Sequence, residues 1–115
     1  MDGAVARHVL RLVGLGVRSR GAVVGVERVR DAARRGKLAL AVVAKDASKH
    51  SLSKVVPLLA ARRVHVVSAA HAAELGRAVG REHTAVVGIV DQQLAQGIRE
   101  LTDSAPGRSQ GEHSA

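Results

Sequence analysis

The stretch 38-LALAVVA-44 decides the fold of this chain, because it is apolar throughout and lacks the alternation of a strand that has one solvated face. An unbroken apolar run of this length is typical of a central β-strand that is covered on both of its faces. The polar segment KDASKHS (45–51) that follows is expected to be a loop. A strand buried on both faces requires helices above and below the sheet.

Upstream of this strand, apolar residues recur at helical spacing in two places. The first is an amphipathic helix over residues 5–13, and we expect Gly14 and Gly16 to end it. A very short strand over residues 22–24 then leads into a second helix over residues 25–36, whose last glycine closes it. The chain therefore alternates between helix and strand before it reaches the central strand.

Downstream of the central strand, the same alternation continues. In chain order we expect a helix capped by Ser48 or Ser51, a strand within 62–67, a helix over 71–79, a strand over 84–90 and a helix over 91–101. Pro57 lies inside the first of these helices and should bend or shift it. The pattern predicts an α/β fold, a helix–sheet–helix sandwich that forms one domain over residues 1–101. The polar remainder, 102–115, is expected to be a disordered tail.

The composition favours a polyanionic partner. Eighteen Lys and Arg against ten Asp and Glu give a formal net charge of +8, which attracts nucleic acid over long range. The chain has no Phe, Trp or Tyr, so it lacks the aromatic rings on which single-stranded nucleic acid commonly stacks. Binding to a folded RNA shape remains open.

No catalytic or cofactor site is recognisable in the sequence. The absence of cysteine excludes disulfides, thiolate metal sites and a catalytic thiol. No two of the six histidines have the spacing of metal ligands on one helix, and GLG at 14–16 lacks the third glycine of a dinucleotide site. We therefore expect no enzymatic activity, no cofactor and no metal. No apolar run is long enough for a membrane span, so we expect no membrane partner and a cytoplasmic location.

Three segments carry a resemblance to a known family: RRGKLALAVVAKDAS (34–48), RRVHVV (62–67) and ELGRAVGREHTAVVGIVD (74–91). Together they resemble the kink-turn-binding ribosomal protein family of large-subunit proteins L7Ae and L30e, and most closely its YlxQ-like bacterial members. The resemblance implies a three-layer α/β/α sandwich with a small mixed four-stranded sheet. It also implies binding to a kink-turn, an RNA helix that is sharply bent at an internal loop with sheared G·A pairs.

In this family the second helix begins with a Gly-x-Asn-Glu motif and carries a lysine one turn later, and these residues read the G·A pairs. The corresponding residues here are Gly25, Val26, Glu27 and Arg28, with Asp31 at the position of the lysine. Only Gly25 matches, so the resemblance implies RNA affinity, whereas kink-turn specificity requires changed roles. Glu27 can accept from guanine amino groups, and Arg28 can donate to guanine O6 or N7 or to a phosphate.

Charged residues around this helix have different expected roles. Asp31 brings a negative charge where the family has a positive one, and we expect it to pair with Arg34 or Arg35. Arg18 and Arg20, in the loop that leads toward the helix, are expected to contact phosphates. The free N–H groups and the positive dipole end at the start of the helix also suit a phosphate.

The second contact of the family is the loop after the strand VHVV (64–67). Here that loop consists of Ser68, Ala69, Ala70 and His71. Its small apolar side chains are expected to pack against flipped-out bases, and its N–H groups at the start of a helix to bind phosphate. Lys45, which follows the central strand, completes the predicted RNA-binding residues.

The sequence thus predicts a non-enzymatic RNA-binding protein, associated with the ribosome, that binds a structured, kink-turn-like RNA. The partners expected are this RNA, ribosomal or other, and the ribosome. The alternative is a ribosome-associated protein-interaction module that has lost kink-turn specificity, as the changes at Val26, Glu27, Arg28 and Asp31 would permit.

Overall fold

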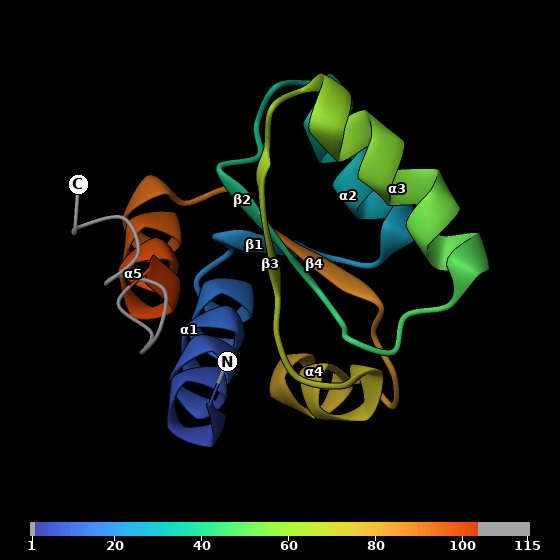
Figure 1. Cartoon of the computed structure of the whole chain (residues 1–115). Helices are drawn as coiled ribbons and strands as arrows, with labels where there is room; N and C mark the ends of the chain where they lie inside the picture. The colour runs from blue at the N-terminus through green and yellow to red at the C-terminus, as the bar shows by residue number, and fades with distance from the viewer. Residues whose placement is uncertain (1, 104–115) are drawn as a thin grey trace, which may run out of the picture.

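The computed structural model describes residues 2–103, and in this range helices and strands alternate as predicted (Figure 1). In chain order the elements are α1 (Gly3–Arg18), β1 (Ala22–Val24), α2 (Val26–Arg34), β2 (Leu40–Val43), α3 (Lys49–Ala61), β3 (His65–Ser68), α4 (Ala72–Val79), β4 (Val86–Ile89) and α5 (Gln92–Asp103). None of these helices is long and apolar enough to cross a lipid bilayer.

The four strands form one mixed sheet in the order β1-β4-β2-β3. β2 pairs in parallel with β3 and antiparallel with β4, and β1 pairs antiparallel with β4. In the middle of the sheet, Leu40 lies opposite His65 on one side and Ile89 on the other. All four residues of β2 are buried, so the run 38–44 does contain an interior strand. The predicted small mixed four-stranded sheet is confirmed.

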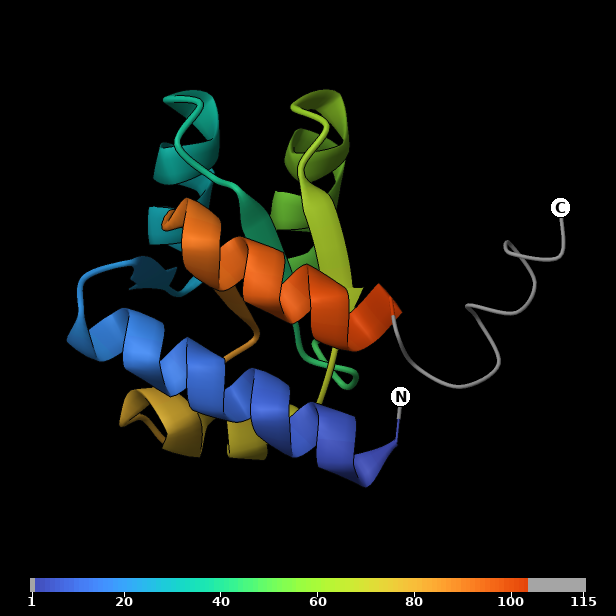
Figure 2. The ribbon, with the colours of Figure 1, turned by 90° about the vertical axis from the view of Figure 1, so that its left-hand side faces the viewer.

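Helices cover both faces of this sheet, with α2 and α3 on one face and α1, α4 and α5 on the other (Figures 1 and 2). Successive side chains of a strand point to opposite faces. Leu40 and Val42 accordingly belong to the core under α1, α4 and α5, whereas Ala41 and Val43 belong to the core under α2 and α3. This division explains why the run is apolar at every position, and it confirms the three-layer α/β/α sandwich.

The predicted end of the first helix is wrong, because α1 continues through Gly14 and Gly16 to Arg18. Both glycines are buried. A Cβ at Gly14 would lie 3.0 Å from the carbonyl oxygen of Ala78 in α4, and one at Gly16 would lie 3.2 Å from the Cδ1 atom of Leu94 in α5. These glycines therefore permit close packing of α1 against its neighbours and do not act as helix stops.

The other predicted boundaries lie close to the observed ones. Ser48 caps α3, since its hydroxyl oxygen accepts from the N–H of Ser51 at 3.1 Å. Asp91 caps α5 through the N–H of Leu94 at 2.9 Å. Pro57 lies inside α3, which runs on to Ala61. α5 extends to residue 103, two residues beyond the predicted domain boundary, and the remainder of the predicted tail, 104–115, lies outside the described residues.

Candidate functional site

Three of the helices begin at the same end of the sheet. β1 and β2 both run antiparallel to β4, and β3 runs parallel to β2, so the carboxyl ends of β1, β2 and β3 lie beside the amino end of β4. α2, α3 and α4 each follow one of these carboxyl ends, at the lower right of the sheet in Figure 1. We call this region, residues 25–28, 45–49, 68–72 and 81–85, the helix-start surface. The positive ends of three helix dipoles meet there.

Backbone hydrogen bonds connect the segments of the helix-start surface to one another and to the sheet. They run from the N–H of Gly25 to Val86 O (3.0 Å), of Ala44 to Ala85 O (2.8 Å), of Lys45 to Ala70 O (2.8 Å) and of Thr84 to Ala72 O (3.0 Å). Because each bond joins segments that are distant in sequence, the surface is held by the sheet rather than by any single loop. Its geometry is therefore fixed before a ligand binds.

The amino terminus of α4 is capped by two carboxylates. The N–H of Ala72 donates to Asp46 Oδ1 at 2.7 Å, and the N–H of His71 donates to Glu74 Oε1 at 3.0 Å. The hydrogen bond from Ala72 is the main cause that lowers the pKa of Asp46, and the charges of His71 and His83 lower it further. The hydrogen bond from His71 likewise lowers the pKa of Glu74. Both carboxylates are therefore ionised at neutral pH, and both accept hydrogen bonds from N–H groups at the start of α4.

α2 begins without such a cap. Its N-cap residue is Gly25, which has φ +97° and ψ 160° and offers no side chain to the N–H groups of the first turn. A Cβ at this position would meet no atom within 4 Å, so the space in front of the helix is open. Only glycine adopts this backbone conformation readily. The first turn of α2 therefore presents uncapped N–H donors to a ligand from outside the chain.

The lowered pKa of Asp46 leads to a testable pH dependence. A carboxyl whose pKa is lower in the folded state stabilises the fold above its unfolded pKa, and this contribution is lost as the pH falls through the folded pKa. We expect Asp46→Asn to be less stable than the wild type at neutral pH, because α4 loses an anionic cap. The difference should shrink in acid below the ordinary pKa of an aspartate. Chemical denaturation across this pH range measures it, with Glu100→Gln on α5 as a control that leaves α4 untouched. An equally large difference at the acidic end would contradict the capping role.

Exposed basic side chains surround these helix starts. They are Arg28, Lys45, Lys49, His71, Arg81 and His83. Three exposed carboxylates lie on the surface, Glu27, Asp46 and Glu82, and Glu74 lies next to it in the first turn of α4; Asp46 and Glu74 are used as caps. The arrangement suits a ligand that presents phosphates together with hydrogen-bond donors, because a carboxylate such as Glu27 can accept from a base while the cations hold the backbone.

A pocket of about 550 Å³ lies along α2, from its first turn to its carboxyl end. Its lining includes Glu27, Arg28 and Asp31, the three charged positions that depart from the family motif, together with the apolar Val23 and Val90. The carboxylate of Asp31 lies 3.2 Å from the Nε atom of Arg35, which confirms one of the two pairings predicted for it. Glu27, Arg28 and Asp31 therefore line the same pocket.

The structure brings together most of the predicted site residues. Gly25, Val26, Glu27, Arg28, Lys45, Ser68 and His71 all lie on the helix-start surface. Ala69 and Ala70 belong to the same loop, but they are only 0% and 4% exposed. Ala69 belongs to the core under α1, α4 and α5, and Ala70 is buried as well, so neither methyl group is exposed for the small apolar contacts to bases that were predicted.

Arg18 and Arg20 do not join this site. Arg18 is the last residue of α1, and Arg20 lies in the turn before β1. β1 runs from this turn toward Gly25, so the two arginines lie at the opposite end of the sheet from the start of α2 (Figure 1). Arg18 and Arg20 are close in sequence to Gly25, which suggested a shared phosphate site. The strand β1 lies between them and separates the two arginines from the start of α2.

The segment 81–85 is a part of the surface that the sequence did not reveal as a binding element. It precedes β4, and β4 pairs with β1 in a register that sets Val24 opposite Val87. This pairing carries the exposed Arg81 and His83 to the side of the sheet where α2 begins. Only the strand order shows this, since residues 25 and 81 are far apart in the chain.

The sequence matches a known protein family. The model of the ribosomal protein L7Ae/L30e/S12e/Gadd45 family matches residues 7–100. The chain belongs to this family. One similar protein is the RNA-binding protein YlxQ of Bacillus subtilis (strain 168). It is 32% identical over 92 residues, or 80% of this chain and 92% of the relative.

Solved structures share the fold of this chain. A protein with unknown function from Bacillus halodurans C superposes with a TM-score of 0.76 at 28% identity, covering 84% of this chain and 97% of its own. The 15.5kD RNA binding protein of Giardia lamblia superposes with a TM-score of 0.75 at 22% identity, covering 88% and 87%. The second likeness, at this identity, concerns the fold alone.

Proposed function

We propose that this protein is a non-enzymatic RNA-binding protein that recognises a structured, kink-turn-like RNA through the helix-start surface, and that it acts in association with the ribosome. The observation that carries the proposal is the uncapped amino terminus of α2 at Gly25, which lies at the same end of the sheet as two other helix starts. Membership of the L7Ae/L30e family and similarity to an RNA-binding protein support it.

The proposed contacts divide into positioning and reading. The first-turn N–H groups of α2 and the side chains of Lys45, Lys49 and Arg81 bind phosphates, which fixes the orientation of the RNA without regard to sequence. Glu27 and Arg28 lie in the same turn as the open N–H groups. Glu27 accepts from guanine amino groups and Arg28 donates to guanine O6 or N7, so guanine-rich internal loops fit best.

A titration of RNA tests the proposal. Binding of a kink-turn RNA is compared with that of a plain duplex of equal length, each at two salt concentrations. We expect tighter binding of the kink-turn RNA and a steep loss of affinity with salt, because phosphate contacts release counterions. Equal, weak binding of both RNAs would contradict the proposal. An apolar protein contact through the pocket beside α2 would then be favoured, and its affinity would change little with salt.

Position 31 offers a gain-of-affinity prediction. We expect Asp31→Lys to bind kink-turn RNA roughly two- to fivefold more tightly, since it replaces a negative charge beside Glu27 and Arg28 by a positive one, an effect of about 0.5–1 kcal/mol at an exposed site. The lost ion pair to Arg35 is exposed and contributes little to stability. Glu100→Lys on α5 makes the same change of charge away from the surface and should give a smaller gain. A larger gain from Glu100→Lys would place the RNA elsewhere.

A further inference from the structure

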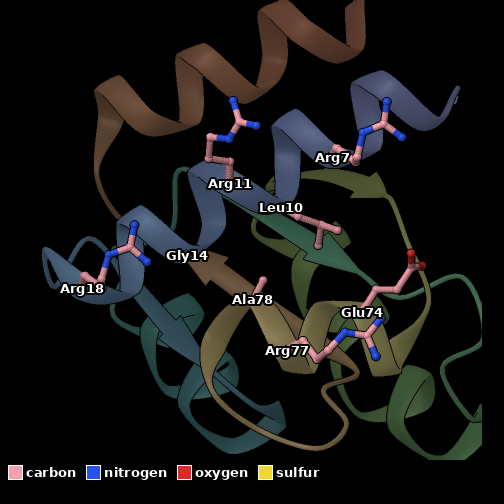
Figure 3. Close-up of a pocket in the computed structure, with 8 residues that line it drawn as sticks. All are labelled: Arg7, Leu10, Arg11, Gly14, Arg18, Glu74, Arg77 and Ala78. Atoms are coloured by element: carbon pink, nitrogen blue, oxygen red, sulfur yellow. The ribbon is translucent and has the colours of Figure 1, made fainter.

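A second basic surface lies between α1 and α4, in a groove of about 550 Å³ (Figure 3). Arg7, Arg11 and Arg18 line it from α1, and Arg77 lines it from α4. All four arginines are exposed. Leu10 of α1 and Ala78 of α4 contribute apolar surface to the groove. Gly14 allows this geometry, because a Cβ there would lie 3.0 Å from the carbonyl oxygen of Ala78.

Within residues 2–103, carboxylates neutralise only part of the charge of this groove: Asp2 interacts electrostatically with Arg7 and Glu74 with Arg77, and both carboxylates also accept from backbone N–H groups at helix starts. Neither the ion pair of Asp31 with Arg35 nor the contact of His71 Nδ1 with Glu74 Oε1 includes an arginine of the groove. Glu74 is the one carboxylate in the lining, and it accepts from the N–H of His71 at the start of α4. Four arginines therefore line the groove with a single carboxylate, which is already used as a cap.

The arginines of α1 form a row rather than a single anion site. Arg7, Arg11 and Arg18 are four and seven residues apart, which places them on one face of the helix at axial steps of about 6 and 10 Å. A row of about 16 Å is too long for one phosphate and spans several nucleotides of a strand. Guanidinium groups suit such a ligand because they bind phosphate oxygens through two parallel hydrogen bonds and also stack on bases.

The groove continues from the helix-start surface along α4. His71 lies on that surface, and Glu74 and Arg77 follow it at successive turns of the helix. From residue 71 to residue 77 the helix rises only about 9 Å. A strand that leaves the helix-start surface at His71 therefore meets Arg77 first and the row on α1 next. Arg18, which is separated from Gly25 by the sheet, has its cationic neighbours here.

We propose that the groove between α1 and α4 binds the phosphate backbone of a single RNA strand that continues from the RNA held at the helix-start surface. This proposal rests on the proposed function, because it gives the same RNA a second site of contact. An acidic polypeptide is the competing occupant. Continuity with the helix-start surface and the length of the arginine row favour the RNA strand.

The test separates the two surfaces by the length of the RNA. The variant Arg7→Gln, Arg11→Gln and Arg77→Gln is titrated with a minimal kink-turn RNA and with the same RNA extended by a single-stranded uridine tract at one end or at the other. The control variant Arg34→Gln, Arg62→Gln and Arg99→Gln removes the same charge from exposed positions outside both surfaces. Thermal unfolding confirms that both variants fold.

We expect the groove variant to bind one of the extended RNAs about tenfold more weakly than the control variant does, while the minimal RNA is bound equally by both. For that extended RNA, the slope of the logarithm of the binding constant against the logarithm of the salt concentration should become shallower by roughly two. Each lost phosphate contact to a single strand accounts for about 0.7 of this change. Equal binding of the extended RNAs by both variants would overturn the groove proposal and leave the proposed function intact.

Two further outcomes also decide. If the wild type binds the minimal kink-turn RNA no better than a plain duplex, the proposed function fails and the groove proposal fails with it. If a polyglutamate peptide binds the wild type more tightly than the uridine extension does, and only the groove variant loses the peptide, the occupant is an acidic polypeptide and the RNA proposal is overturned.

Discussion

Gly25→Glu is expected to weaken binding of a kink-turn RNA by about 1–3 kcal/mol, or roughly 5-fold to 150-fold, which is the range for loss of a specific polar contact to a nucleic acid. The substitution places a carboxylate in front of the uncapped N–H groups of α2, where the RNA backbone is proposed to lie. Its negative charge repels phosphate, and its side chain holds the backbone away from the helix. The measurement is an equilibrium titration at low and at moderate salt.

Two controls separate this effect from strain at the glycine. Gly25→Ala has the same unfavourable positive φ without the charge, so it should lose stability but keep most of its preference for bent RNA. Gly36→Glu adds the same charge at another positive φ, +69°, at the far end of the same helix, and should keep the preference too. If Gly36→Glu weakens binding as much as Gly25→Glu does, the effect is one of net charge and the site at α2 is contradicted.

The central strand could be predicted because burial on both faces requires an apolar residue at every position. Leu40 and Val42 pack into one core and Ala41 and Val43 into the other, so no position in the run tolerates a polar residue. Helix caps were predictable for a similar reason, since Ser48 and Asp91 act on N–H groups only three residues away. Properties that depend on near neighbours in the chain are readable from the chain.

Properties that depend on distant neighbours were not readable. Gly14 and Gly16 suggest a helix end by composition, and only the approach of α4 and α5 shows that they serve packing. The burial of Ala69 depends on the core that it shares with residues of α1, α4 and α5. The distance of Arg18 from the start of α2 depends on the extended strand β1 between them, and the presence of segment 81–85 beside that start depends on the strand order β1-β4-β2-β3.

Gly76→Ala is expected to destabilise the fold by about 1–3 kcal/mol, the usual cost of an added methyl group in a well-packed site. A Cβ at Gly76 would lie 2.6 Å from the carbonyl oxygen of Glu82 and 2.9 Å from that of Arg81. Both are backbone atoms, so α4 or the segment 81–85 must move. The melting temperature should fall by roughly 4–8 °C for each kcal/mol in a domain of this size.

The matched control is Gly97→Ala in α5, where the new Cβ would lie 3.5 Å from the Cδ1 atom of Leu12, an ordinary contact. There the helix propensity of alanine should act alone and raise stability by up to about 1 kcal/mol. Because segment 81–85 forms part of the helix-start surface, Gly76→Ala should also weaken RNA binding, whereas Gly97→Ala should not. A Gly76→Ala protein as stable as the wild type would show that α4 and this segment are not in close contact. Lower stability with unchanged RNA affinity would instead remove segment 81–85 from the proposed interface.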